Sequence, residues 1–314
     1  MNLTFSILSR TSIHNWTTIN IESWIIPVDI FTTLCIIFSM IFALIFLLTI
    51  VVDKTCHTVP IMLNANSCLA VFVMGISVLS FNTFTLQNDL KQIEYQDSLC
   101  VLRGYIGYSV CAIVNYSFVL QALFQYMTAV YPHYLFYQSV RSQILLIIIA
   151  WIIGFTYPLE FLLRDEIIFN VDNQICQIPM KLSFSITYMS FCIFIIPILV
   201  IMFIYIKLIL YVKKISKRVV SVNILFRAQR ELKMIRRTVI LVAILSTICA
   251  PYQTLIIISL FTEPPKYHFR IAYVFLDLSL LCVIIVLFQF TDPVKTSIMK
   301  RIRRLSNMII PTIS

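Results

Sequence analysis

The sequence predicts an all-α integral membrane protein, a seven-transmembrane helix bundle followed by a short amphipathic eighth helix. Of its 314 residues, 60% are hydrophobic and only 12% are charged, and the mean hydropathy is +0.93. A soluble domain carries roughly twice this charged fraction. Apolar stretches long enough to cross a hydrocarbon layer of ~30 Å recur seven times. The polar intervals between them are too short to form a separate soluble domain.

The predicted elements divide the chain into three regions. Residues 1–23 form an extracellular N-terminus, residues 24–290 hold the seven spans, and residues 291–314 form the amphipathic helix and a short cytoplasmic tail. Asp292 and Pro293 begin the amphipathic helix, because proline fits the first turn of a helix, and the basic residues that follow suit an inner leaflet. The spans are predicted at Trp24–Val52, Pro60–Phe84, Cys100–Pro132, Ile144–Leu163, Leu182–Val212, Thr238–Phe261 and Phe269–Phe290.

The third span is predicted to be the central helix. Seven of its residues recur at spacings of three or four and therefore share one helical face. These residues are Gly104, Tyr108, Cys111, Asn115, Phe118, Ala122 and Gln125. An unpaired amide in lipid costs several kcal/mol, so the amide side chains on this face should point toward other helices.

The net charge of +10 is explained by topology. Seventeen of the 24 Lys and Arg residues fall in segments predicted to lie inside, so the positive-inside rule places the N-terminus outside and the C-terminus in the cytoplasm. This distribution favours contact with membrane lipids over binding to nucleic acid. Asn2 and Asn15 begin glycosylation sequons on the predicted outer side. No basic region followed by an apolar core begins the chain, so we expect no cleavable signal peptide.

Two cysteines and two prolines stand out. Of the nine cysteines, only Cys100 and Cys176 are predicted to face the oxidising side. They either form a disulfide between the third span and the second outer loop or remain two free thiols. Pro197 and Pro251 lie deep inside spans, where each removes a backbone hydrogen bond and kinks its helix. For Pro251, a role in packing and a role as a hinge are equally compatible with the sequence.

Catalytic and metal-binding motifs are absent from the sequence. All four glycines lie within predicted spans, so no glycine-rich loop can cradle a phosphate. The four histidines are isolated, which removes paired-histidine metal sites. No GxSxG nucleophile turn occurs. We therefore expect no enzyme activity, no cofactor and no metal.

Together these features resemble the rhodopsin-like (class A, family 1) G-protein-coupled receptors, of which this chain looks like a divergent orphan member. The resemblance covers nearly the whole chain. The family's disulfide cysteines are matched by Cys100 and Cys176, and its Asp-Arg-Tyr motif by Phe124-Gln125-Tyr126, with Pro132 beyond it. Further matches are Trp151 in the fourth span, Pro197 and Tyr205 in the fifth, and Glu231 and Pro251 in the sixth.

The chain departs from the family at several motif positions. Gln125 replaces the motif arginine, so an ionic pair with Glu231 cannot form. The seventh-span Asn-Pro-x-x-Tyr is replaced by residues 284–288, Ile-Ile-Val-Leu-Phe. The fold assignment survives, because it rests on the spans, the cysteine spacing and the prolines. The resemblance implies that coupling and switching involve Gln125, Tyr126, Tyr205, Glu231 and Pro251.

Asp277 is the most informative polar residue, because it lies about midway through the seventh span, where an acid is costly unless paired or hydrated. Three readings stand: a hydrogen bond to a neighbour such as Asn115, a protonated carboxyl group, or a counter-ion for a cationic ligand. The residues expected to share a ligand cavity with Asp277 are Tyr252, Gln253, Tyr273, Tyr108 and Cys111.

The resemblance implies a receptor at the plasma membrane that binds an extracellular ligand and activates heterotrimeric G proteins. The sixth helix would swing about Pro251 and open an inner crevice. Two alternatives remain. A transporter or channel would need a polar pathway, although the spans hold few ionisable residues. A receptor-like protein that no longer signals would explain the replacement at Gln125.

Overall fold

A computed structural model describes residues 22–53, 56–181, 183–216, 229, 232–233, 236, 239–240, 242–243, 246–247, 250–259, 261–263 and 265–309. Six spans in these residues are long and apolar enough to cross a membrane. They are α1 (Ile25–Val52), α2 (Val59–Lys91), α3 (Cys100–Val130), α5 (Val140–Thr156) with α6 (Leu159–Leu163), α7 (Phe184–Ser190) with α8 (Ile196–Ser216), and α11 (His268–Phe290). The sixth predicted span is described mainly by α10 (Ala250–Ser259).

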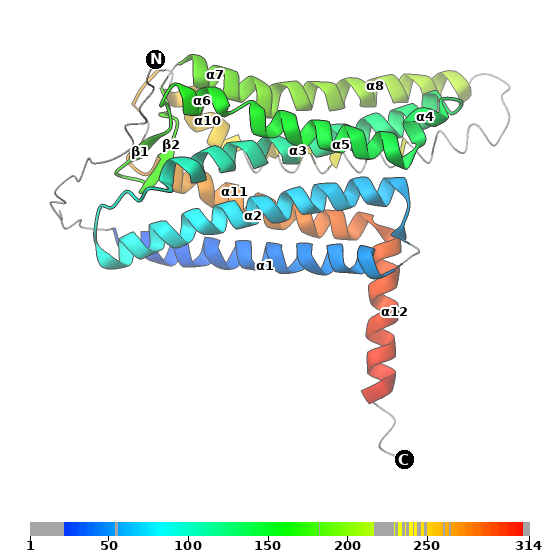
Figure 1. Cartoon of the computed structure of the whole chain (residues 1–314), viewed down its shortest axis with the longest axis horizontal. Coiled ribbons are helices and arrows are strands. Elements are labelled where there is room, and N and C mark those ends of the chain that lie inside the picture. Colours follow the sequence, from blue (N-terminus) through cyan, green and yellow to red (C-terminus); the bar gives the residue numbers. More distant parts are fainter. Residues whose placement is uncertain are drawn as a thin grey trace, which may run out of the picture.

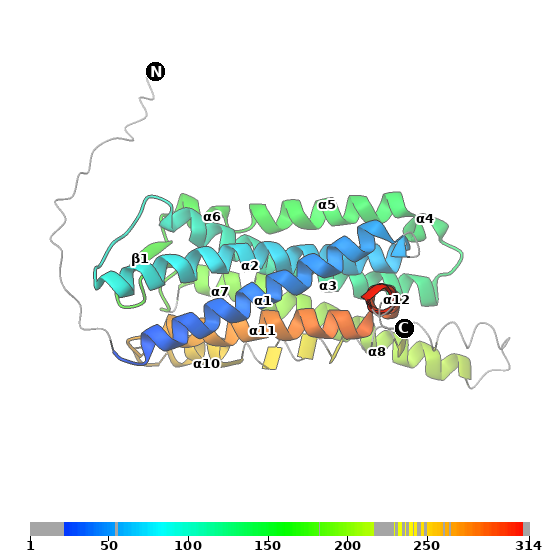
Figure 2. The same ribbon diagram turned by 90° about the horizontal axis from the view of Figure 1, so that it is seen from below.

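The helices run side by side along the long axis of an elongated bundle (Figures 1 and 2). Helix α3 lies inside this bundle, where it contacts α2, α5 and α8. Of the seven residues that share the predicted inner face of α3, six are buried and Cys111 is half-buried. The predicted central position of the third span is therefore confirmed. Trp151 on α5 donates a 2.9 Å hydrogen bond to Asn66 on α2.

A two-stranded antiparallel hairpin, which the all-helical prediction did not include, covers one end of the bundle. Strands β1 (Ile168–Asn170) and β2 (Ile175–Gln177) pair with Phe169 opposite Cys176. The turn between the strands is closed locally, because the side-chain oxygen of Asn170 accepts hydrogen bonds from the backbone and the side chain of Asn173. The Cys100–Cys176 disulfide links β2 to the first residue of α3, which confirms the predicted pair. We call this end of the bundle the disulfide end.

Two spans differ from their predicted outlines. Helix α2 continues beyond Phe84 to Lys91, about two turns further. Polar residues can form this extension because Asn88 and Asp89 are buried there with tertiary hydrogen-bond partners. In the fifth span, a π-helical segment, η2 (Phe191–Ile195), precedes Pro197. Proline lacks the N–H that would bond to the carbonyl four residues earlier, and a local π segment accommodates this loss.

The end opposite the disulfide holds the short helix α4 (Leu135–Gln138) and the beginning of α12 (Asp292–Ile309). Helix α12 begins at the predicted residue and leaves the bundle crosswise (Figure 1). Val294 and Ser297 are buried, whereas Lys295 and Lys300 are exposed, so the first turns are amphipathic. The side chain of Asn64 on α2 donates a 3.3 Å hydrogen bond to Thr291, just before α12.

Candidate functional site

A cavity opens among the helices at the disulfide end. It contains about 640 Å³ of space not filled by atoms, a figure that includes its opening to solvent. Its walls come from α2, α3, β2, α7, η2, α10 and α11. The lining residues are Met74, Val78, Phe81, Gly107, Tyr108, Cys111, Gln177, Met189, Ile193, Phe194, Tyr252, Ala272, Tyr273 and Leu276.

Four of the six residues expected at the ligand site line this cavity. Tyr108 and Cys111 lie on α3, Tyr252 on α10 and Tyr273 on α11. Residues more than 140 positions apart in the sequence are thus brought to one place by the bundle. Asp277 and Gln253 are not lining residues.

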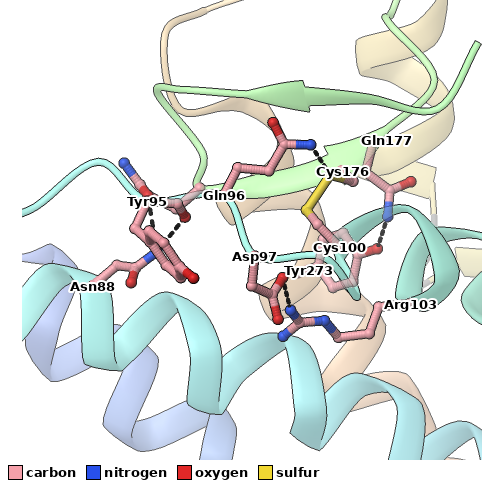
Figure 3. Close-up of a disulfide and its surroundings, with 10 residues drawn as sticks. Asn88, Tyr95, Gln96, Asp97, Cys100, Arg103, Cys176, Gln177 and Tyr273 are labelled. Carbon is pink, nitrogen blue, oxygen red and sulfur yellow. Dashed lines mark hydrogen bonds and ion pairs between the residues drawn. A yellow bond between two sulfur atoms is a disulfide. The ribbon is translucent and has the colours of Figure 1, made fainter. Parts of the chain in front are cut away.

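The hairpin forms the roof of the cavity. The side-chain amide of Gln177 donates a 2.6 Å hydrogen bond to the hydroxyl of Tyr273, and the backbone N–H of Ile178 donates a 3.1 Å hydrogen bond to the hydroxyl of Tyr108. Figure 3 shows Gln177 and Tyr273 facing each other beside the disulfide. A Cβ atom on Gly104 would lie 2.7 Å from the carbonyl oxygen of Cys176, so only glycine permits this close approach of β2 to α3.

Asp277 lies apart from the cavity wall. Its side chain is fully buried, and Oδ2 accepts a 3.0 Å hydrogen bond from the side-chain amide of Asn82 on α2. Its Oδ1 atom has no hydrogen-bond partner among the described residues. The neighbour considered from the sequence, Asn115, instead donates to the carbonyl of Cys111 within α3. The geometry therefore matches the hydrogen-bonded reading of Asp277, with a different partner.

The predicted switch residues lie toward the opposite end of the bundle. Gln125 is buried, and its Oε1 atom has no hydrogen-bond partner within the described part of the chain. Tyr126 is half-buried and packs edge-on against Tyr131, with 6.2 Å between the ring centroids. Tyr205 is also half-buried, on α8. Pro251 lies in α10. Glu231 and the sequons at Asn2 and Asn15 lie outside the described residues.

A buried ion cluster joins three helices at the disulfide end. Arg270 on α11 donates from Nη1 to Asp29 on α1 at 3.0 Å and to Asp89 on α2 at 2.5 Å. Its Nη2 donates to the second oxygen of Asp89 at 2.9 Å. This cluster was not predicted from the sequence. The usable signal was that three ionisable residues lie at the outer ends of apolar spans, because such residues pair with one another.

The turn of the hairpin is attached to the same cluster. The side-chain oxygen of Asn173 accepts a hydrogen bond from the backbone N–H of Arg270 at 3.2 Å, and its amide donates to the carbonyl of Lys266 at 3.2 Å. Gln174 accepts a 3.1 Å hydrogen bond from Asn88 on α2. The roof is therefore bonded to α2, α3 and α11.

Comparison with known proteins agrees with this architecture. The family model described as "7 transmembrane receptor (rhodopsin family)" matches residues 27–293. A solved structure described as "Crystal structure of squid rhodopsin" superposes with a TM-score of 0.74 and 14% sequence identity, covering 91% of this chain and 88% of that one. A search of curated protein sequences finds no match. The family match covers most of the seven-span region, and the chain belongs to the rhodopsin family of 7 transmembrane receptors.

Proposed function

We propose that this chain is a G-protein-coupled receptor of the plasma membrane, which binds an extracellular ligand in the cavity at the disulfide end and activates heterotrimeric G proteins. The observation that carries the proposal is the roofed cavity itself, found in a chain of the rhodopsin family. The charge distribution supports an extracellular N-terminus, an extracellular disulfide end and a cytoplasmic C-terminus. Glycosylation at Asn2 and Asn15 would fit this orientation.

The proposed mechanism is a shift between two arrangements of the bundle. A molecule in the cavity would touch Tyr252, the residue that follows Pro251 on α10. Contacts that differ between two arrangements favour one of them, and a helix that turns about Pro251 would open the opposite end. Gln125, Tyr126, Tyr205 and Glu231 belong to the coupling end in this proposal, where they would face a G protein. Asp277 and Gln253 do not line the cavity, so in this proposal they would affect ligand binding without touching the ligand.

The test is nucleotide exchange on purified heterotrimeric G proteins, added to membranes that contain the chain and exposed to a broad compound library. Ala272 lines the cavity and is buried, so Ala272→Trp should fill the cavity and abolish the compound-evoked exchange. Ile271 is its neighbour on α11 and is exposed, so Ile271→Trp is the matched control and should leave the response unchanged. A response that survives Ala272→Trp would refute the assignment of this cavity.

A second candidate, a receptor-like protein that no longer signals, is favoured by Gln125, which is buried and whose Oε1 atom has no hydrogen-bond partner among the described residues. Under this alternative, native membranes would show neither basal nor compound-evoked exchange, and Gln125→Arg would restore coupling. If native Gln125 supports exchange, the alternative is refuted. Transport or channel activity would be recognised by uptake or currents in cells that lack G proteins.

A further inference from the structure

The cavity lining carries no charged side chain. None of its residues is Asp, Glu, Lys, Arg or His. The nearest acid along α11, Asp277, is fully buried and bonded to Asn82, and it does not reach the lining. Arg270 is also absent from the lining, and both of its terminal nitrogens are engaged by Asp29 and Asp89. A charged group entering this cavity would lose its water without gaining an opposite charge.

Two hydroxyl groups in the lining are oriented by the roof. Tyr108 accepts a hydrogen bond from the backbone of Ile178, and Tyr273 accepts one from the side chain of Gln177. Gln177 and Ile178 are consecutive residues, so one short stretch of chain fixes both phenols.

The remaining hydrogen-bonding capacity of these hydroxyls is donation. A phenol has one hydrogen to donate in addition to its acceptor lone pairs. Because each oxygen already accepts from the roof, its hydrogen is directed away from the roof, in a side chain that lines the cavity. Each phenol can therefore donate to an occupant of the cavity while it accepts from the roof.

From the uncharged lining and the two oriented donors, we infer that the cavity takes an uncharged, mostly apolar ligand whose hydrogen-bond acceptor, such as a carbonyl or ether oxygen, is recognised by Tyr108 and Tyr273. This inference rests on the proposed function, which makes the cavity the ligand site. It deepens that proposal by naming the ligand class and by excluding amines paired with Asp277.

Cys111 provides a direct probe, because it lines the cavity and is half-buried. Its thiol can be labelled with methanethiosulfonates, which form a mixed disulfide and release methanesulfinate. Four reagents are compared on the purified full-length chain: benzyl (uncharged), phenacyl (uncharged with a carbonyl), 2-(trimethylammonio)ethyl (cationic) and 2-sulfonatoethyl (anionic). Rates are measured by peptide mass spectrometry and divided by the rate of each reagent with free cysteine, and Cys111→Ser identifies the labelled peptide.

Both uncharged reagents should label Cys111 at least tenfold faster than either charged reagent. Phenacyl labelling should also be several-fold faster than benzyl labelling. In the Tyr108→Phe, Tyr273→Phe double variant the ratio of phenacyl to benzyl rates should fall close to one, while the preference over charged reagents stays. Cys192 is similarly half-buried but does not line the cavity, and its phenacyl-to-benzyl ratio should not respond to the double variant.

Three outcomes would overturn the inference. The cationic reagent could label Cys111 as fast as the benzyl reagent, the phenacyl and benzyl rates could already be equal in the native chain, or no reagent could reach Cys111. The labelling needs no G protein, so its failure is separate from a failure of nucleotide exchange. Conversely, a chain that shows the expected labelling but no exchange would retain the cavity chemistry and lose the proposed function.

Discussion

Replacing Arg270 with alanine should strongly destabilise the bundle. The Arg270 side chain is 6% exposed, and its partners Asp89 and Asp29 are 3% and 15% exposed. Without the guanidinium, two carboxylates would remain close together with no cation between them. Breaking a buried ion pair by removing one partner costs about 3–5 kcal/mol. The matched control is Arg164→Ala, because Arg164 pairs with Glu160 at 2.7 Å with a side chain that is 52% exposed, and such surface pairs contribute about 0–1 kcal/mol.

The assay is the apparent unfolding midpoint of the purified chain in detergent, followed by intrinsic fluorescence at a fixed heating rate. A loss of 3–5 kcal/mol corresponds to a decrease of roughly 6–20 °C if about 2–4 °C accompanies each kcal/mol. Adding Asp89→Leu to Arg270→Met should recover part of the loss, since replacing both partners with apolar groups removes the uncompensated charge. If Arg270→Ala lowers the midpoint no more than Arg164→Ala does, the cluster is not the structural tie described above.

Three further perturbations test the roof and the buried acid with the same midpoint assay. Cys176→Ser opens a disulfide that spans 76 residues and should cost about 2–5 kcal/mol, whereas equal midpoints would show that the hydrogen bonds alone hold the hairpin. Gly104→Ala should lower the midpoint, because the new Cβ would lie 2.7 Å from the backbone oxygen of Cys176. Gly107→Ala should lower it less, because its nearest neighbour is the Phe81 ring at 3.3 Å. A larger loss for Gly107→Ala than for Gly104→Ala would contradict the close approach of β2 to α3. Asp277→Asn should leave the midpoint unchanged or raise it. Asn82→Ala should cost about 1–3 kcal/mol, because it leaves the buried carboxyl group of Asp277 without its hydrogen-bond donor. A large decrease in the midpoint of Asp277→Asn would show that the charge of Asp277 stabilises the bundle.

The spans and the inner face of α3 could be predicted because lipid imposes strict rules. Backbone groups in hydrocarbon must bond within their own helix, so apolar length alone locates a span. The spacing of Gly104, Tyr108 and Asn115 identified one face, since residues three and four apart lie together on any helix. The pairing of Cys100 with Cys176 followed from chemistry, because they were the two cysteines expected on the oxidising side.

The partners of the buried polar residues could not be predicted from these rules. A periodic pattern shows which side of a helix turns inward, but it does not give the rotation and depth of the neighbouring helices. From the sequence, Asn115 was the neighbour named for Asp277, whereas the packing of α2 against α11 brings Asn82 to it. Asp29 lies near the outer end of the first span, where the sequence alone offers lipid headgroups as its surroundings, yet the packing of α1 against α11 brings it to Arg270. The hairpin escaped prediction because its strands have three residues each.

The contacts of the roof also limit which helices would move if a ligand entered the cavity. The hairpin is linked to α3 by the disulfide, to α11 through Asn173 and Gln177, and to α2 through Gln174. Arg270 joins α11 to α1 and α2 at the same level. These helices and the roof are therefore tied together at the disulfide end, and donors held in place bind with less loss of conformational entropy. Under the proposed function, a ligand held by these elements would shift the bundle through the remaining cavity walls, which are α7, η2 and α10.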